Sequence, residues 1–303
     1  MEKVLVVFGP TASGKSSVAI ELAKLLNGEV ISADSMQIYR GMNIGTAKVT
    51  TAEMQGIPHH LLNVVDANQK FSVADFKKVA VEAISDILSR GKQPIICGGT
   101  GLYIDALIKN ISFEEEPEES ELRKYLFAEH KTKGSAWMHS RLVELDPNSA
   151  AAIHENNTKR VIRALEVTIQ SGIPFSLQKE RAISNPPEFD FRMFGLAHER
   201  EVLYERINRR VDVMFQQGLV EEAKQFMNSH PAATSTQAIG YKELATYFSG
   251  AHTLDEATEK IKMETRRYAK RQITWMKRYS DAVWINCMNL SAAEIAAQII
   301  KAF

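Results

Sequence analysis

The chain has few cysteines and no excess of charge of either sign. Its 303 residues include two cysteines, Cys97 and Cys287, which lie far apart and outside any CxxC pair. This argues against a disulfide framework and a cysteine-based zinc site, and it fits a reducing intracellular setting. His59 and His60 have no metal-ligand spacing, so we expect them to be structural. The 37 basic and 37 acidic side chains cancel, and the net charge therefore gives no sign of a polyanionic partner.

Long apolar runs are also missing. Met1 to Lys3 lead into one short apolar stretch and then a glycine-containing loop, which is too little for a signal peptide or a membrane span. We expect a cytoplasmic protein that does not enter a membrane. With 45% apolar and 24% charged residues the composition is that of a globular protein. The length allows one large α/β domain, or a core with a smaller second domain.

Short apolar strands alternate with amphipathic helices near the N-terminus. Val4 to Phe8, Glu29 to Ser32 and Pro94 to Cys97 have the pattern of strands buried in a sheet. Ser16 to Leu26 and Ser72 to Arg90 place apolar residues at helical spacing. This alternation predicts an α/β fold built on a doubly wound parallel sheet.

Two proline-containing segments then divide the chain. Phe113 to Glu121 packs six carboxylates around a proline, and Ser184 to Glu188 is a second linker. We therefore predict an all-helical insert at 113–188 within a core of 1–112 and 189–303. The insert pattern breaks near Gly134, Pro147 and Gly172.

The core pattern resumes after the second linker. Phe191 to Ala197 and Ala282 to Asn286 read as strands. Long helices are expected at about 199–217 and 254–279, and an amphipathic helix from Ser291 closes the chain.

A phosphate-binding motif follows the first strand. It matches GxxxxGK[ST] and lies between a buried strand and a helix, as a P-loop should. Its backbone N–H groups and the helix N-terminus would hold a diphosphate or triphosphate. A kinase, an NTPase and a transferase that releases diphosphate all use such a site, so the motif alone leaves the reaction open. The residues are Gly9, Pro10, Thr11, Ala12, Ser13, Gly14, Lys15 and Ser16.

Polar residues follow two more strands at the same predicted edge. Asp34 comes after the second strand, and Thr100 lies in the glycine-rich turn Gly98 to Gly101. Ligands of open α/β sheets bind at this edge. Asp34 could hold Mg²⁺ or act as a general base, or it could cap the next turn. Thr100 could donate to a phosphate oxygen, or it could belong to a tight turn without a ligand.

Four segments resemble the bacterial tRNA dimethylallyltransferases, also called tRNA isopentenyltransferases. They are the P-loop, Asp34 to Lys48 (DSMQIYRGMNIGTAK), Gly98 to Tyr103 (GGTGLY) and Lys270 to Trp275 (KRQITW). The resemblance extends over nearly the whole chain. Asn43 departs from it, because the family usually has Asp there, and at Ser16 the family more often has Thr.

The resemblance implies the reaction. The family transfers the dimethylallyl group of dimethylallyl diphosphate to the exocyclic amine of the adenosine 3′ of the anticodon in tRNA, and diphosphate is released. By this resemblance Asp34 is the general base, while Lys15, Thr100 and Arg210, rather than Arg209, complete the catalytic site. Mg²⁺ is the expected cofactor, with Ser16 and Asp34 as ligands, and the protein is expected to be a monomer.

Residues 258–280 carry eight basic and two acidic side chains, net +6, interleaved with aromatics. This composition is typical of RNA-binding segments, and also of a solvated helix with aromatics in the core. The resemblance favours contact with the anticodon stem-loop. The residues it assigns to tRNA are Asp34, Ser35, Met36, Gln37, Thr100, Arg123, Lys159, Arg160, Val161, Ile162, Arg163, Gln237, Ala238, Ile239, Gly240, Tyr241, Lys242, Lys270, Arg271, Gln272, Ile273, Thr274, Trp275, Met276 and Lys277.

Three other functions compete. A prenyltransferase acting on free AMP, ADP or ATP would share the P-loop and Asp34, but it would not need the basic segments. A small-molecule P-loop kinase would use the insert as a lid. A nucleotide-dependent RNA-binding protein without catalysis would not require Asp34 and Thr100 at this edge of the sheet.

Overall fold

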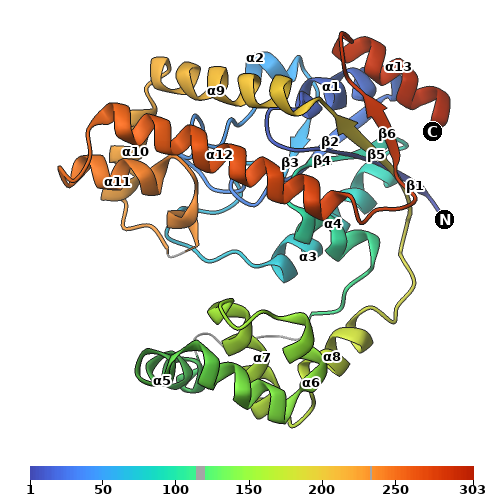
Figure 1. Cartoon of the computed structure of the whole chain (residues 1–303). Coiled ribbons are helices and arrows are strands. Elements are labelled where there is room, and N and C mark those ends of the chain that lie inside the picture. Colours follow the sequence, from blue (N-terminus) through green and yellow to red (C-terminus); the bar gives the residue numbers. More distant parts are fainter. Residues whose placement is uncertain (114–119, 233) are drawn as a thin grey trace. The chain divides into compact units, whose positions relative to one another are not determined.

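The computed structural model describes residues 1–113, 120–232 and 234–303 (Figure 1). Its contacts divide the chain into two compact units, one formed by 1–108 with 187–303 and the other by 109–186. From the sequence we expected an insert at 113–188, with bounds a few residues away from these. Residues 114–119 of the acidic linker lie outside the described residues.

Six parallel strands form the sheet of the first unit, in the order β3-β2-β4-β1-β5-β6. The predicted doubly wound parallel sheet is therefore confirmed. Phe8 and Ala33, at the ends of β1 and β2, both pair with Gly98 at the end of β4. The segments that follow these three strands consequently leave the sheet at one edge. The strands are β1 (Lys3–Phe8), β2 (Gly28–Ala33), β3 (His59–His60), β4 (Gln93–Gly98), β5 (Asp190–Ala197) and β6 (Val283–Asn286).

Helices cover both faces of this sheet. Val6 and Phe8 of β1 belong to one hydrophobic cluster and Leu5 and Val7 to another, because successive side chains of a strand point to opposite faces. The helices of the first unit are α1 (Lys15–Leu26), α2 (Thr51–Met54), α3 (Val73–Ser89), α4 (Gly101–Ile108), α9 (Arg200–Gln216), α10 (Leu219–Asn228), α11 (Tyr241–Phe248), α12 (Leu254–Met276) and α13 (Ala292–Ala302), with a short 3₁₀ turn at Ser235–Gln237.

α3 begins at the predicted capping box. Ser72 Oγ accepts a hydrogen bond from the Asp75 N–H (3.2 Å), and the Asp75 carboxylate accepts one from the Ser72 N–H (2.8 Å). These bonds satisfy donors that the first turn of a helix leaves without partners. The apolar stripe then buries Phe76 and Ile84 completely.

The sequence analysis did not find β3. This edge strand has two residues, both histidines, which is too short and too polar for a periodic signal. Its His59 pairs with Val30 of β2. Helices α2 and α10 were also not predicted.

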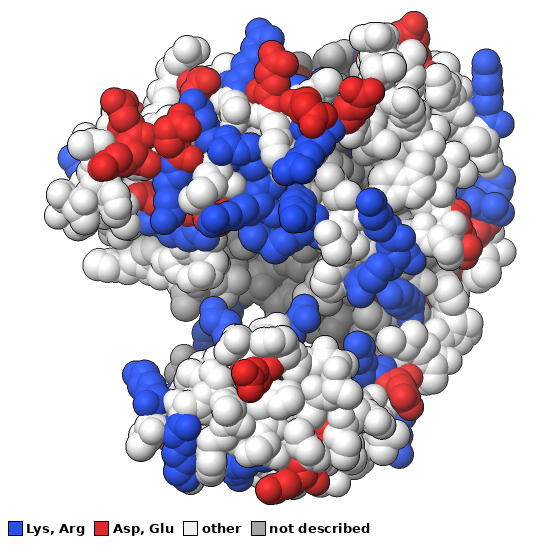
Figure 2. Space-filling model, in the orientation of Figure 1, with Lys and Arg blue, Asp and Glu red and all other residues white. Residues whose placement is uncertain are grey.

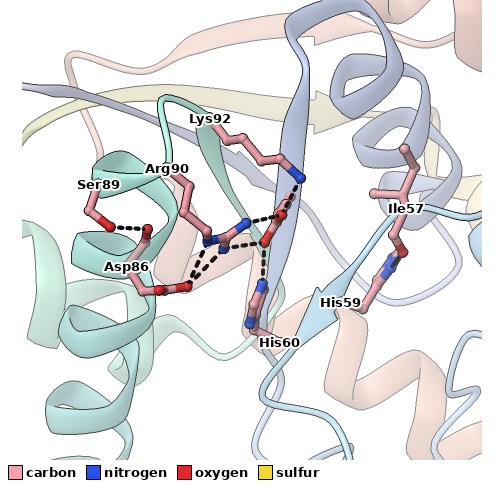
Figure 3. Close-up of polar contacts among 8 residues, drawn as sticks. Ile57, His59, His60, Asp86, Ser89, Arg90 and Lys92 are labelled. Carbon is pink, nitrogen blue, oxygen red and sulfur yellow. Dashed lines mark hydrogen bonds and ion pairs between the residues drawn. The ribbon is translucent and has the colours of Figure 1, made fainter.

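A buried carboxylate ties this edge of the sheet together. Glu29 of β2 is 2% exposed and accepts hydrogen bonds from Arg90 (2.5 and 2.7 Å) and Lys92 (2.7 Å), while His60 Nε2 lies 2.7 Å away. Figure 3 shows Arg90 and Lys92, from the turn between α3 and β4, and His60 of β3 pointing toward one another. The Arg90 hydrogen bond, followed by those of Lys92 and His60, holds the pKa of Glu29 well below its usual value. His59 Nδ1 lies 2.9 Å from the Ile57 carbonyl, so both histidines have structural contacts.

Replacing Glu29 with glutamine is expected to lower the free energy of unfolding at pH 7 by about 2–3 kcal/mol, because three basic groups lose a buried counter-charge. The loss is not larger because water partly solvates these basic groups. Since the folded-state pKa of Glu29 is depressed, this stabilisation is complete above about pH 6 and shrinks as the pH falls below 4.5. Urea denaturation of both proteins between pH 7 and pH 3 measures the difference. Glu82→Gln, at an exposed position of α3, is the control. A difference that does not change with pH would contradict the ionic origin.

The described residues of the second unit form helices around a separate core. They are α5 (Glu121–Leu145), α6 (Pro147–Ala152), α7 (Thr158–Ser171) and α8 (Phe175–Ala182). α5 is interrupted at Gly134, where φ is 83°, and α7 ends at Gly172, as the sequence predicts. In the part of the chain that the structure describes, no helix has the length and apolar character of a membrane span.

Candidate active site

A cavity of about 470 Å³ lies in the first unit, at the edge where β1, β2 and β4 end. Its wall includes the P-loop after β1, Asp34 after β2, and Cys97 with Gly98 at the end of β4. α9, α11 and α12 contribute three further basic residues, Arg210, Lys242 and Arg271. This is the predicted edge of the sheet.

The P-loop has the backbone of an anion site. Ala12 and Gly14 have left-handed φ angles of 64° and 86°, which turn the chain back before α1 begins at Lys15. Gly14 precedes the helix and has no side chain with which to cap its first N–H groups. These donors, together with the positive end of the helix dipole, remain available for an anion.

Two half-buried cations face this loop. Lys15 Nζ donates to the Pro10 carbonyl (3.1 Å), and Arg210 donates to Thr11 Oγ1 (3.4 Å). Burial lowers the pKa of both side chains, and each is further lowered by a neighbouring positive charge. Within the described residues neither forms a salt bridge, so an anion in the cavity would compensate both charges. Arg209, the alternative that the sequence left open, is exposed and does not line the cavity.

Three further side chains hold the P-loop from outside. Arg206 Nε donates to the Ala12 carbonyl (2.8 Å), and His198 Nε2 lies 2.8 Å from the Ser13 carbonyl. Gln272 Oε1 accepts from the Thr11 N–H (2.8 Å), and its amide donates to the carbonyl of Gly99 (2.9 Å). These bonds fix the strained turn at Ala12. The sequence analysis missed Arg206 and His198, because both lie almost 200 residues from the motif and follow no recognisable spacing.

Asp34 faces the cavity from a turn that it also caps. Its Oδ1 accepts hydrogen bonds from the N–H groups of Met36 (2.9 Å) and Gln37 (3.4 Å). The capping interpretation and a chemical role are therefore compatible, because one carboxylate oxygen holds the turn.

Thr100 holds the backbone next to Asp34. Its Oγ1 accepts from the N–H of Ser35 (3.0 Å), directly beside Asp34. Among the described residues that line the cavity Thr100 does not occur. The hydroxyl thus supports the turn that carries Asp34.

The donors for a magnesium ion are oxygen atoms, as this ion prefers. The exposed Ser16 and the half-buried Asp34 both line the cavity. The described residues contain no cluster of three or more His, Cys, Asp or Glu side chains able to hold a metal. Ser16 and Asp34 fit an ion that takes most of its ligands from phosphate oxygens and water.

Part of the wall is apolar. α9, α10 and α12 turn aliphatic side chains toward the cavity, close to the loop that follows the 3₁₀ turn. This surface suits a short hydrocarbon chain beside the anion site. Its members include Met36, Val211, Met214, Leu219, Ala238, Ile239 and Ile261.

α12 carries the basic segment that was predicted to bind tRNA. Lys270, Arg271 and Lys277 are exposed, and Figure 2 shows Lys and Arg side chains gathered over this helix. Thr274 is exposed too, and Ile273 is half-buried. Gln272 and Met276 are buried, and because Gln272 also lines the cavity, the prediction of direct contact is corrected for Met276 alone. Gln272 supports the P-loop, and Met276 packs in the core.

Trp275 is half-buried and packs on the glycine turn. A Cβ atom at Gly101 would lie 2.2 Å from its Cδ1 atom, so only glycine fits there. The guanidinium of Arg278 lies 4.1 Å from the centre of the indole ring. Packing on the turn therefore accounts for Trp275 without RNA.

Two other predicted tRNA segments contain buried members. Tyr241 is fully buried, whereas Gln237, Ala238, Ile239, Gly240 and Lys242 line the cavity. In the insert, Val161 and Ile162 are about 1% exposed and form its core. For Tyr241, Val161 and Ile162 the prediction of direct contact is corrected, because helical periodicity turns these side chains inward.

The four basic residues of the insert that were assigned to tRNA fall into two groups. Arg123 and Arg163 both form ion pairs with the buried Glu166, at 2.7 and 3.0 Å. Lys159 and Arg160 are exposed at the start of α7. Arg123 and Arg163 therefore also hold the insert together, while Lys159 and Arg160 are free to meet a ligand.

Comparisons with known proteins give the family and the relatives to which this chain is similar. A family model described as IPP transferase matches residues 37–279. The tRNA dimethylallyltransferase of Acetivibrio thermocellus is 50% identical over 288 residues, which cover 94% of this chain and 92% of that protein. The tRNA dimethylallyltransferase of Bacillus subtilis is 44% identical over 308 residues, covering 98% and 96%.

Solved structures show the same similarity. The tRNA isopentenylpyrophosphate transferase of Bacillus halodurans has a TM-score of 0.74 and 43% identity, with 99% of this chain and 96% of that chain covered. A eukaryotic dimethylallyltransferase acting on tRNA has a TM-score of 0.83 and 31% identity, with 99% and 78% covered.

Proposed function

Because this chain belongs to the IPP transferase family, we propose that it transfers the dimethylallyl group of dimethylallyl diphosphate to the exocyclic amine of the adenosine 3′ of the anticodon in tRNA. The observation that carries the proposal is that the P-loop, Asp34 and Arg210 line one cavity with an apolar wall. The P-loop would then hold a leaving diphosphate, and the aliphatic side chains would hold the hydrocarbon.

The bond that breaks joins the allylic carbon to the diphosphate oxygen. Its electron pair leaves with diphosphate, so negative charge grows in the P-loop during the step. Lys15, Arg210 and the N–H groups before α1 meet this charge from fixed positions. Stabilisation of developing charge by preorganised donors is a major source of enzymatic rate enhancement.

The bond that forms joins the exocyclic nitrogen of adenine to the allylic carbon. This amine is a weak nucleophile, because its lone pair is delocalised into the ring. Asp34, in the wall of the same cavity, would accept the proton that the nitrogen loses. Thr100 holds the backbone beside Asp34 and would keep the carboxylate in place.

The proposal includes Mg²⁺. Ser16 and Asp34 would supply protein oxygens to it, and the bound ion would neutralise part of the diphosphate charge. We further propose that the protein acts as a cytoplasmic monomer. The support for the compartment is that both cysteines are buried and free, as suits a reducing environment. Light scattering of the purified protein would test the monomer.

Labelled dimethylallyl diphosphate tests the proposal directly. The protein is incubated with the label and unmodified tRNA, and separately with the label and AMP. We expect label in tRNA only, together with one diphosphate released for each group transferred. Label in AMP would favour an adenylate prenyltransferase, and ADP formed from ATP would favour a kinase.

Lys159 and Arg160 are the insert residues best placed to contact the RNA backbone, because both are exposed. Replacing both with alanine is expected to weaken tRNA binding, and to make its dependence on salt concentration shallower by about two phosphate contacts. Affinity for dimethylallyl diphosphate should stay the same, because the P-loop cavity is formed by the first unit. Filter binding between 50 and 300 mM salt would measure both slope and affinity.

The control for this experiment is Lys131→Ala combined with Lys179→Ala, two exposed insert lysines with no predicted RNA contact. Arg163 is left unchanged, since its loss would also break the pair with Glu166. If the double variant of Lys159 and Arg160 kept both the affinity and the salt slope of the control, these residues would not contact tRNA.

A further inference from the structure

Glu222 of α10 is a buried carboxylate that accepts an unusual set of hydrogen bonds. Its Oε2 accepts from the N–H groups of Asn43 and Ile44, and its Oε1 from that of Gly45, all at 2.9 Å. The hydroxyl of Tyr241 donates to the same Oε1 at 2.7 Å. Glu222 is 9% exposed and lies almost 180 residues from the loop that it holds.

These bonds join two loops of the cavity wall. Gly45, Thr46 and Ala47 line the cavity on one side of the junction, and 237–240 with Lys242 line it on the other. The two loops also touch, because a Cβ atom at Gly45 would lie 2.5 Å from the ring of Tyr241. Glycine is thus required where the loop passes over the buried tyrosine.

The same loop is connected to Asp34. The side-chain amide of Gln37 donates to the carbonyl groups of Thr46 (3.1 Å) and Ala47 (3.3 Å). The N–H of Gln37 in turn donates to Asp34 Oδ1. A continuous set of hydrogen bonds therefore runs from Tyr241 through Glu222 and the 43–47 loop to the carboxylate in the cavity.

We propose that Glu222 is a positioning residue. It holds the 43–47 loop and residues 237–242, which lead into α11, in a fixed position relative to Asp34, and it thereby shapes the side of the active site that binds the acceptor adenosine. This inference rests on the proposed function, because it assigns these loops to the tRNA adenosine rather than to the diphosphate. In the described residues, Glu222 has no hydrogen bond to the P-loop.

The position requires a carboxylate. All four partners are donors: three are backbone N–H groups, and burial followed by the charge of Glu222 raises the pKa of Tyr241 and keeps its hydroxyl protonated. A glutamine has one acceptor oxygen, and its NH₂ group would face one of these donors. The amide variant therefore has nearly the same shape but cannot satisfy the loop.

The test compares Glu222→Gln with Glu221→Gln, an exposed neighbour that loses the same charge. For Glu222→Gln we expect kcat/KM for tRNA to fall at least about tenfold, as for a buried donor left unsatisfied. Inhibition by inorganic diphosphate should stay within about twofold, since the P-loop contacts are untouched. Glu221→Gln should match the wild type in both measurements.

Tyr241→Phe provides a milder second variant if Glu222→Gln folds poorly. It removes one donor and leaves the three backbone bonds, so kcat/KM for tRNA should fall by about three- to tenfold. Equal kcat/KM values for tRNA in Glu222→Gln and Glu221→Gln would overturn the inference. The inference would also be overturned if Glu222→Gln lost diphosphate inhibition as strongly as it lost kcat/KM for tRNA, because Glu222 would then support folding in general. A wild type that transfers no label to tRNA would instead contradict the proposed function.

Discussion

Replacing Asp34 with asparagine is expected to lower turnover by at least about two orders of magnitude, the usual scale for loss of a general base. Asparagine keeps an oxygen for the N–H groups of Met36 and Gln37, so the turn should persist. What disappears is the oxygen able to accept a proton from the adenine amine. Binding of tRNA and of dimethylallyl diphosphate should remain nearly unchanged.

Single-turnover transfer of labelled dimethylallyl groups measures this loss without a contribution from product release. Asp255→Asn, at an exposed position in the first turn of α12, is the matched control and should react as the wild type does. If the Asp34 variant transferred the group at a near-normal single-turnover rate, Asp34 would not be the base. The hydrogen bonds to Met36 and Gln37 would then be its main role.

Replacing Lys15 with alanine is expected to raise the barrier to transfer by about 3 kcal/mol, roughly a hundredfold in rate, because one preorganised charge on the leaving diphosphate is lost. Burial lowers the pKa of Lys15, and the half-buried ammonium is held where it is only partly solvated. A charge in such surroundings interacts more strongly with an anion than it would in water. Arg210 remains in the variant and should preserve part of the activity.

Inorganic diphosphate provides the second measurement for Lys15. It should inhibit the wild type by occupying the P-loop, and it should inhibit the alanine variant much less. Lys78→Ala, which removes an exposed lysine of α3, is the control for the loss of charge. Equal inhibition of all three proteins would show that diphosphate does not leave from this loop.

The sequence by itself determined the class of fold and the type of site. Continuous apolar strands such as Val4 to Phe8 are compatible only with burial on both faces, and alternating them with amphipathic helices leads to a parallel sheet. The P-loop could be recognised because its function depends on local backbone geometry, which a contiguous motif encodes. Asp34 followed from its place at the end of a strand.

Only the tertiary structure decided which side chains support that site. Arg206, His198 and Glu222 reach their partners across nearly 200 residues of chain, and pairing at such separations leaves no periodic signal in a sequence. Burial separated true surface residues from buried ones within the predicted tRNA segments, as for Lys270 beside Gln272. A helix presents neighbouring residues about 100° apart, so residues of one contiguous motif point both to the surface and to the core. The packing of that helix against the rest of the fold decides which of these residues are exposed and which are buried.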